Sequence, residues 1–130
     1  MATLHKEVFI RAPLEDVWDA IRDLGALHTR LVPGFVVATR LDGDTRTVTF
    51  GNGLVAREVI LSLDDERRRL AWNAEGGRTT HYNAVVQVFT APGGTRLVWT
   101  TDLLPHAMAE PIAGMQDQAL ATMKKTLEKE

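Results

Sequence analysis

Histidines and acidic side chains are the residues of this chain that could carry acid–base or metal chemistry. The four histidines are His5, His28, His81 and His106, and no H-x-H or H-E-x-x-H spacing occurs among them. A zinc or iron site would need three ligands from distant segments, and the sequence has no cysteine to supply a thiolate. We therefore expect no metal site. A Ser-His-Asp triad cannot be read from spacing, because its members meet only in space.

A glycine-rich segment raises the question of a dinucleotide cofactor. Residues 51–56, G-N-G-L-V-A, match the G-x-G-x-x-A form of the dinucleotide-binding fingerprint. That fingerprint needs a helix directly after it, whose N-terminus holds the pyrophosphate. The residues that follow are typical of a β-strand, so the segment predicts a hairpin turn and no cofactor.

Glu58 is a carboxylate among apolar neighbours on an expected central strand, and Trp72 occupies the matching position of the next strand. Ionised carboxylates are rarely buried, which favours a solvated Glu58. Trp72 favours the alternative, in which Glu58 faces a pocket. In that case we expect Glu58 to pair with His81, with Arg30 or with a ligand hydroxyl.

Polar and apolar side chains alternate along residues 79–90. His81, Asn83 and Gln87 lie on one face, and a tyrosine, an alanine and two valines lie on the other. Apolar side chains normally face the core, which would leave the polar face in solvent. In the alternative, the polar face lines a cavity and orients a ligand.

The turn after this strand decides between the two faces. A three-residue turn at 92–94 pairs Gln87 with Trp99 and puts the polar face on the side of Trp99. A two-residue turn at 93–94 pairs Val88 with Trp99 and puts the apolar face there. A slip of one residue inverts the whole strand.

One polar residue interrupts the apolar stripe of the last expected helix. Gln116 lies close in angle to Ile112 and Ala119, and Met115 belongs to the same stripe. Small side chains keep space open beside this helix, where a core would hold leucine. The pattern indicates that the stripe lines a cavity, and a polar contact at the helix end is the alternative for Gln116.

The elements that would position these residues follow from periodicity and from the glycine and proline signals. We expect helices over 13–24, 26–31 and 111–128, and strands at 5–10, 35–41, 45–50, 55–63, 69–74, 79–90 and 95–104. One helix about 10 Å wide cannot cover seven strands about 4.8 Å apart. The sheet must therefore curl around the last helix and leave a cavity. Arg30 lies at one end of that cavity or in a solvated loop.

Composition limits the classes of function. The chain has 130 residues, of which 45% are hydrophobic and 25% charged, which suits one domain with one core over residues 1–130. The net charge of -2 is spread along the chain and argues against a nucleic-acid partner. No apolar run approaches the roughly 18 residues of a membrane span, and no signal peptide is visible. We expect a cytoplasmic location by default.

Several phrases, in this order along the whole chain, resemble the SRPBCC superfamily of START-like, helix-grip proteins. They are A-P-L-E-D-V-W at 12–18, E-V-I-L-S-L-D-D at 58–65 and G-G at 76–77. Three further segments, at 28–34, 80–84 and 99–105, look like its polyketide cyclase/dehydrase-like bacterial branch. The resemblance implies an α+β helix-grip fold, in which a seven-stranded curved antiparallel sheet surrounds a long C-terminal helix, in the order β-α-α-β-β-β-β-β-β-α.

Residues 58–77 are also similar to plant abscisic acid receptors of this fold. There, a glutamate at the position of Glu58 and an aromatic residue at that of Trp72 face the ligand. The same similarity implies ligand-facing residues near Asn83 and Val85, which favours the register that turns His81 inward. The superfamily contains lipid carriers, hormone receptors, aromatase/cyclases and ubiquinone-binding proteins, so the fold does not fix the function.

We expect the chain to bind a small hydrophobic or aromatic ligand in the cavity. The expected ligand-binding residues are Arg30, Glu58, Trp72, His81, Asn83, Trp99, Ile112, Met115, Gln116 and Ala119. The alternative is a polyketide cyclase/aromatase or dehydratase-like enzyme in which His81 and Glu58 supply acid–base catalysis. A third possibility is an assembly subunit without an open pocket.

The same inward orientation of Glu58 and His81 predicts a homodimer. It turns Leu61 and Val86 outward with their neighbours, and soluble monomers rarely expose an apolar patch of that size. With the opposite parity, the valines of residues 79–90 fill the core and the outside is polar.

Overall fold

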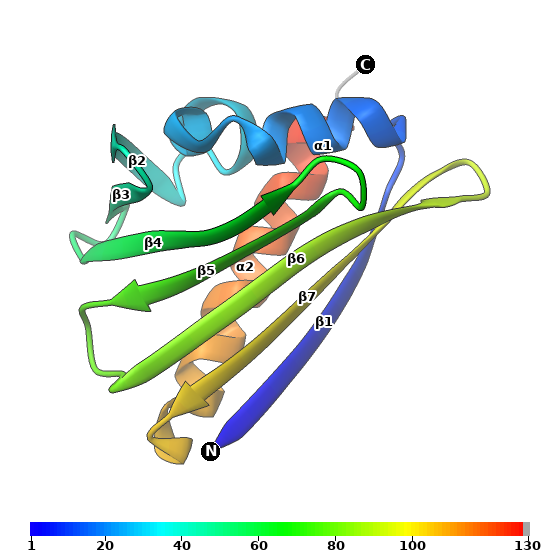
Figure 1. The fold of residues 1–130 in the computed structure, drawn as a ribbon. Helices are drawn as coiled ribbons and strands as arrows, with labels where there is room; N and C mark the ends of the chain where they lie inside the picture. The colour runs from blue at the N-terminus through cyan, green and yellow to red at the C-terminus, as the bar shows by residue number, and fades with distance from the viewer. Residues whose placement is uncertain (129–130) are drawn as a thin grey trace.

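A seven-stranded antiparallel sheet curves around one long helix in the computed structural model, which describes residues 1–128 (Figure 1). The strand order is β1-β7-β6-β5-β4-β3-β2. The strands are β1 (Ala2–Ile10), β2 (Val36–Asp42), β3 (Thr45–Phe50), β4 (Val55–Asp64), β5 (Arg69–Glu75), β6 (His81–Ala91) and β7 (Gly94–Leu104). The predicted α+β helix-grip fold is confirmed.

Two α-helices and three short 3₁₀- or π-helical segments make up the other elements within residues 1–128. They are α1 (Leu14–Arg22), η1 (Leu24–Ala26), η2 (Leu27–Leu31), η3 (His106–Met108) and α2 (Ala109–Leu127). Pro13 precedes α1, and Glu15 and Asp16 lie in its first turn, where acidic side chains complement the helix dipole. None of the helices within residues 1–128 is long and apolar enough to cross a membrane.

The long helix α2 crosses the concave face of the sheet, and α1 runs across the same end of the sheet as the last turns of α2 (Figure 1). The side chains that α2 buries are Gln116, Ala119, Leu120 and Met123, which recur at helical spacing. The three apolar ones join a core whose other members come mainly from α1 and from the inner faces of the strands.

The pairing of β6 with β7 corrects one sequence expectation. Ala91 pairs with Gly94, so the turn consists of Pro92 and Gly93, and Val86 rather than Gln87 lies opposite Trp99. Proline followed by a glycine with a φ of 84° suits the two central positions of a type II turn.

This register fixes which face of β6 points inward. Ala84, Val86 and Val88 are buried in the core, whereas His81 and Asn83 lie on the opposite, convex face. The register favoured by the resemblance to the plant receptors is therefore wrong, and the simple rule that apolar side chains face the core holds.

Candidate ligand-binding site

A cavity of about 350 Å³ lies between the concave face of the sheet and α2. Its wall is mostly aliphatic and aromatic. Seven of the ten expected site residues line it: Glu58, Trp72, Trp99, Ile112, Met115, Gln116 and Ala119. The sheet and the helix each contribute, as the width argument predicted, because the sheet is too broad for one helix to fill its concave face.

The cavity opens where two turns of the sheet meet the start of α2. Exposed residues of the wall, among them Leu54, Gly76, Gly77 and Arg78, come from the β3–β4 and β5–β6 turns. Gly76 has a φ of 110°, and a Cβ there would lie 2.9 Å from the carbonyl oxygen of Val55. Only glycine lets the β5–β6 turn lie this close to the first residue of β4.

Arg46 is a buried charged residue of the wall that sequence reasoning missed. It is 4% exposed, Glu58 is 8% exposed, and Nε of Arg46 donates to Oε1 of Glu58 at 2.7 Å. The β3–β4 hairpin places the two residues directly opposite each other. A signal existed, because a five-residue loop over 50–54 would have paired them, but the glycines at 51 and 53 allowed several loop lengths.

The rest of the environment of Arg46 compensates its charge. Nη1 donates to the carbonyl oxygen of Leu24 at 3.3 Å, and the guanidinium lies 5.9 Å from the ring centroid of Trp72. A buried ion pair is tolerated when each charge has such partners. Within residues 1–128, the charged side chains of the wall are Arg46, Glu58 and the exposed Arg78 at the opening. The interior of the cavity is therefore electrically neutral.

A second polar group in the wall joins α2 to the sheet. Nε2 of Gln116 donates to Oγ1 of Thr101 at 2.9 Å and to the hydroxyl oxygen of Tyr82 at 3.2 Å. Burial raises the pKa of Tyr82 to about 12, so its hydroxyl is neutral at physiological pH. Tyr82 also lines the cavity. Sequence reasoning placed it on the other face, because it assigned the wrong parity to β6.

Three buried polar atoms of the wall have no hydrogen-bond partner among the described residues. They are Nε1 of Trp72, Nε1 of Trp99 and Oε1 of Gln116. The two indole rings lie 6.2 Å apart between centroids, at an interplanar angle of 45°. Most buried polar atoms in proteins are hydrogen-bonded, so three unpaired atoms in one wall distinguish this site from an ordinary core.

The other three expected site residues lie outside the cavity wall. Arg30 is on the surface, where Nη2 donates to Oδ2 of Asp19 at 2.7 Å and Nη1 to Oδ2 of Asp23 at 3.0 Å. These carboxylates, Asp19 first, raise the pKa of Arg30. The short helical segment at 27–31 turns this side chain back toward α1 rather than toward the ligand space.

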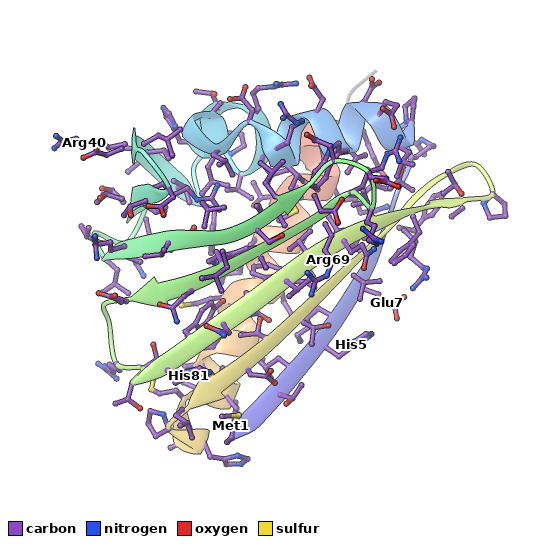
Figure 2. All side chains as sticks on the ribbon, in the orientation of Figure 1. Met1, His5, Glu7, Arg40, Arg69 and His81 are labelled. Carbon is purple, nitrogen blue, oxygen red and sulfur yellow. The ribbon has the colours of Figure 1, made fainter. Side chains whose placement is uncertain are left out.

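Asn83 and His81 belong to the convex face of β6. Oδ1 of Asn83 accepts from Nδ2 of Asn73 at 2.8 Å, across the pair that these residues form on β5 and β6. Figure 2 labels His81 at the start of β6, on a view of the sheet with α2 behind it. The partner of Glu58 is therefore Arg46, and neither His81 nor Arg30 takes that place.

The site is a mostly apolar cavity, open at one end, with a few fixed polar groups in its wall. The fold that builds it can be compared with known proteins. A family model described as polyketide cyclase / dehydrase and lipid transport matches residues 1–128. The chain belongs to this family. The SRPBCC resemblance of the sequence is thereby confirmed, whereas no curated protein sequence matches the chain.

Several solved structures share the fold of this member of the polyketide cyclase / dehydrase and lipid transport family. An uncharacterised protein from Bacillus thuringiensis has a TM-score of 0.86 at 17% identity, covering 98% of this chain and 100% of its own. A START superfamily protein from Mycobacterium smegmatis has a TM-score of 0.79 at 14% identity, covering 97% of both chains. Norcoclaurine synthase from Thalictrum flavum, solved with a transition-state analogue, has a TM-score of 0.68 at 20% identity, covering 97% of this chain and 93% of its own. At these identities the likeness is one of fold.

Proposed function

We propose that this protein binds a small hydrophobic or aromatic ligand in the cavity between the sheet and α2. The observation that carries the proposal is the cavity itself, about 350 Å³ with a mostly apolar wall. Protein interiors contain few voids larger than a water molecule, and ligand pockets begin at about 300 Å³. A space of this size is expensive to leave in a small core and is suited to an aromatic molecule.

Binding is better supported than catalysis by the predicted pair. The enzyme alternative needed His81 and Glu58 to exchange a proton with one substrate. His81 is not part of the cavity wall, and Glu58 is hydrogen-bonded to Arg46. The family description includes lipid transport, which supports a carrier or a binding module for this chain.

Fluorescence titration with the uncharged probe N-phenyl-1-naphthylamine tests the proposal. We expect saturable emission enhancement with the folded protein. Ala119→Trp should abolish it, because Ala119 is buried in the cavity wall and an indole at this position occupies the ligand space. Ala121→Trp is the matched control, since Ala121 is an exposed residue of the same helix, and it should bind normally.

Two outcomes would contradict the proposal. The first is a folded wild-type protein that gives no saturable enhancement. The second is equal binding by the Ala119→Trp and Ala121→Trp variants, which would place the probe elsewhere. If Ala119→Trp does not fold, as judged by circular dichroism, Ile112→Trp on the same lined stripe takes its place.

A homodimer stays a prediction, but the exposed apolar surface that supports it is smaller than expected. Leu61 is 55% exposed on the convex face, as expected, but Val86 is in the core, and Leu63 packs against the core after a β-bulge in β4. The apolar patch is therefore smaller than the sequence indicated. Light scattering at micromolar concentration separates a dimer from a monomer of 14.4 kDa.

A further inference from the structure

We propose that the cavity selects an uncharged aromatic ligand bearing a hydroxyl group, which the indole N–H groups of Trp72 and Trp99 and the amide oxygen of Gln116 hydrogen-bond. This inference rests on the proposed binding function. It adds what that function leaves open, namely the charge of the ligand and the polar group it carries.

The charge follows from the wall. Arg46 and Glu58 neutralise each other at 2.7 Å, and the remaining charged wall residue within 1–128, Arg78, is exposed at the opening. A carboxylate or ammonium group deep in the cavity would lose its hydration and find no counter-charge. A neutral ligand avoids this penalty.

The hydroxyl follows from the unpaired atoms. Two indole N–H groups are donors that need an acceptor, and Oε1 of Gln116 is an acceptor that needs a donor. A hydroxyl group offers both functions in one atom. Nε2 of Gln116 already donates to Thr101 and Tyr82, which leaves Oε1 as the unpaired atom of this amide.

The sheet brings the two indoles together across a strand. Trp72 on β5 lies opposite Ala84 of β6, and Trp99 on β7 lies opposite Val86 of the same strand. The small side chain of Ala84 leaves room for the rings to approach to 6.2 Å over β6. Both indole rings therefore belong to one stretch of the cavity wall.

Contact with the ligand requires a small movement. Each of the three unpaired atoms is shielded from solvent by its neighbours. A ligand oxygen reaches an indole N–H only after that ring rotates, and we expect the fluorescence of Trp72 and Trp99 to change on binding.

Displacement of N-phenyl-1-naphthylamine by 2-naphthol, naphthalene and 2-naphthoate tests the inference near neutral pH. We expect 2-naphthol to bind about three- to tenfold more tightly than naphthalene, because its hydroxyl gains partners that have none. We expect 2-naphthoate to bind at least about 100-fold more weakly than 2-naphthol, because its charge stays unpaired. Binding of naphthalene as tight as that of 2-naphthol, or tighter, would overturn the claim that the cavity selects a hydroxyl group. Binding of 2-naphthoate that is tighter than that of 2-naphthol would overturn the claim that the ligand is uncharged.

Substitutions locate the effect. Trp72→Phe and Trp99→Phe, tested singly, should each bring the ratio of 2-naphthol to naphthalene affinity toward one, since each keeps an aromatic ring and removes one N–H. Trp18→Phe is the matched control, because Nε1 of Trp18 already donates to Oδ1 of Asp65 at 2.8 Å outside the cavity. The control should keep the wild-type ratio. An unchanged ratio in both cavity variants would overturn the assignment.

The outcomes separate this inference from the proposed function. If the probe does not bind, the proposed function fails. If the probe binds and naphthalene displaces it as well as 2-naphthol does, the binding function stands and the polar selection fails. If 2-naphthoate binds tightly and Arg78→Gln removes that binding, the acid is held at the opening and the neutral ligand is wrong.

Discussion

The buried pair of Arg46 and Glu58 gives the sharpest prediction for stability. Arg46→Met leaves the Glu58 carboxylate buried beside the cavity without its counter-charge, and Glu58→Met does the same to the guanidinium. Breaking one side of a buried pair costs about 3–5 kcal/mol of unfolding free energy. Replacing both charges with apolar side chains of similar volume is often nearly neutral. We therefore expect each single variant to lose about 3–5 kcal/mol and the double variant to recover most of it.

Urea unfolding followed by circular dichroism measures these free energies. The matched control is Arg57→Met. Arg57 precedes Glu58 in β4, and its Nη1 lies 3.7 Å from Oε2 of Glu75 on the surface. Exposed pairs contribute about 0.2–1 kcal/mol, so the control should change little. Single variants at Arg46 and Glu58 that each cost under about 1 kcal/mol, and add in the double variant, would show that water reaches the pair. That result would refute the neutral, desolvated cavity.

Two predictions concern pH. Tyr82 is the single tyrosine of the chain, so the ultraviolet absorbance of its phenolate reports its ionisation alone. Its pKa of about 12 predicts ionisation well above the usual 10.0. Because the folded state holds the neutral form, the free energy of unfolding should fall as pH rises from about 10 to 12. A titration midpoint at the usual value in the folded protein would contradict the burial of Tyr82. The salt bridge with Arg22, and then the hydrogen bond from Trp18, lower the pKa of Asp65. The stability that Asp65 contributes is present above its unfolded pKa of about 3.9 and is lost as pH falls through the lower folded value. Asp65→Asn should therefore make the free energy of unfolding, measured with urea, less dependent on pH in the acid range. An unchanged dependence would show that this contact is not maintained in solution.

The fold was predictable because the sequence marks its turns clearly. Glycine and proline mark nearly every turn, and the alternation of apolar residues marks the strands between them. The cavity follows from the widths of the sheet and the helix, and the sequence pattern identifies Trp72, Trp99 and the apolar stripe of α2 as its wall. The last helix begins at Ala109 rather than Pro111, after a short 3₁₀ turn, and helix ends are the least certain part of such predictions.

The errors at His81, Asn83 and Tyr82 share one cause, which is the register of β6. Residues 92–94 are a proline and two glycines, so several turns differing by one residue were compatible with the sequence. Each one-residue step inverts the strand. Placing His81 inward and Tyr82 outward followed from that single choice. Arg46 was missed for a related reason. It alternates with threonines along β3, and only its pairing with Glu58 shows that the side chain is needed inside.

Intermolecular nuclear Overhauser effects from bound N-phenyl-1-naphthylamine to protein methyl groups test the central claim most directly. Val85 and Val86 are neighbours in the chain on opposite faces of β6, and Val86 lines the cavity. The account predicts contacts from the probe to the methyl groups of Val86, Met115 and Ala119, and none to Val85. Contacts to Val85 or to the exposed Leu61, without any to Val86, would show that the ligand binds the convex face and that the cavity is not the binding site.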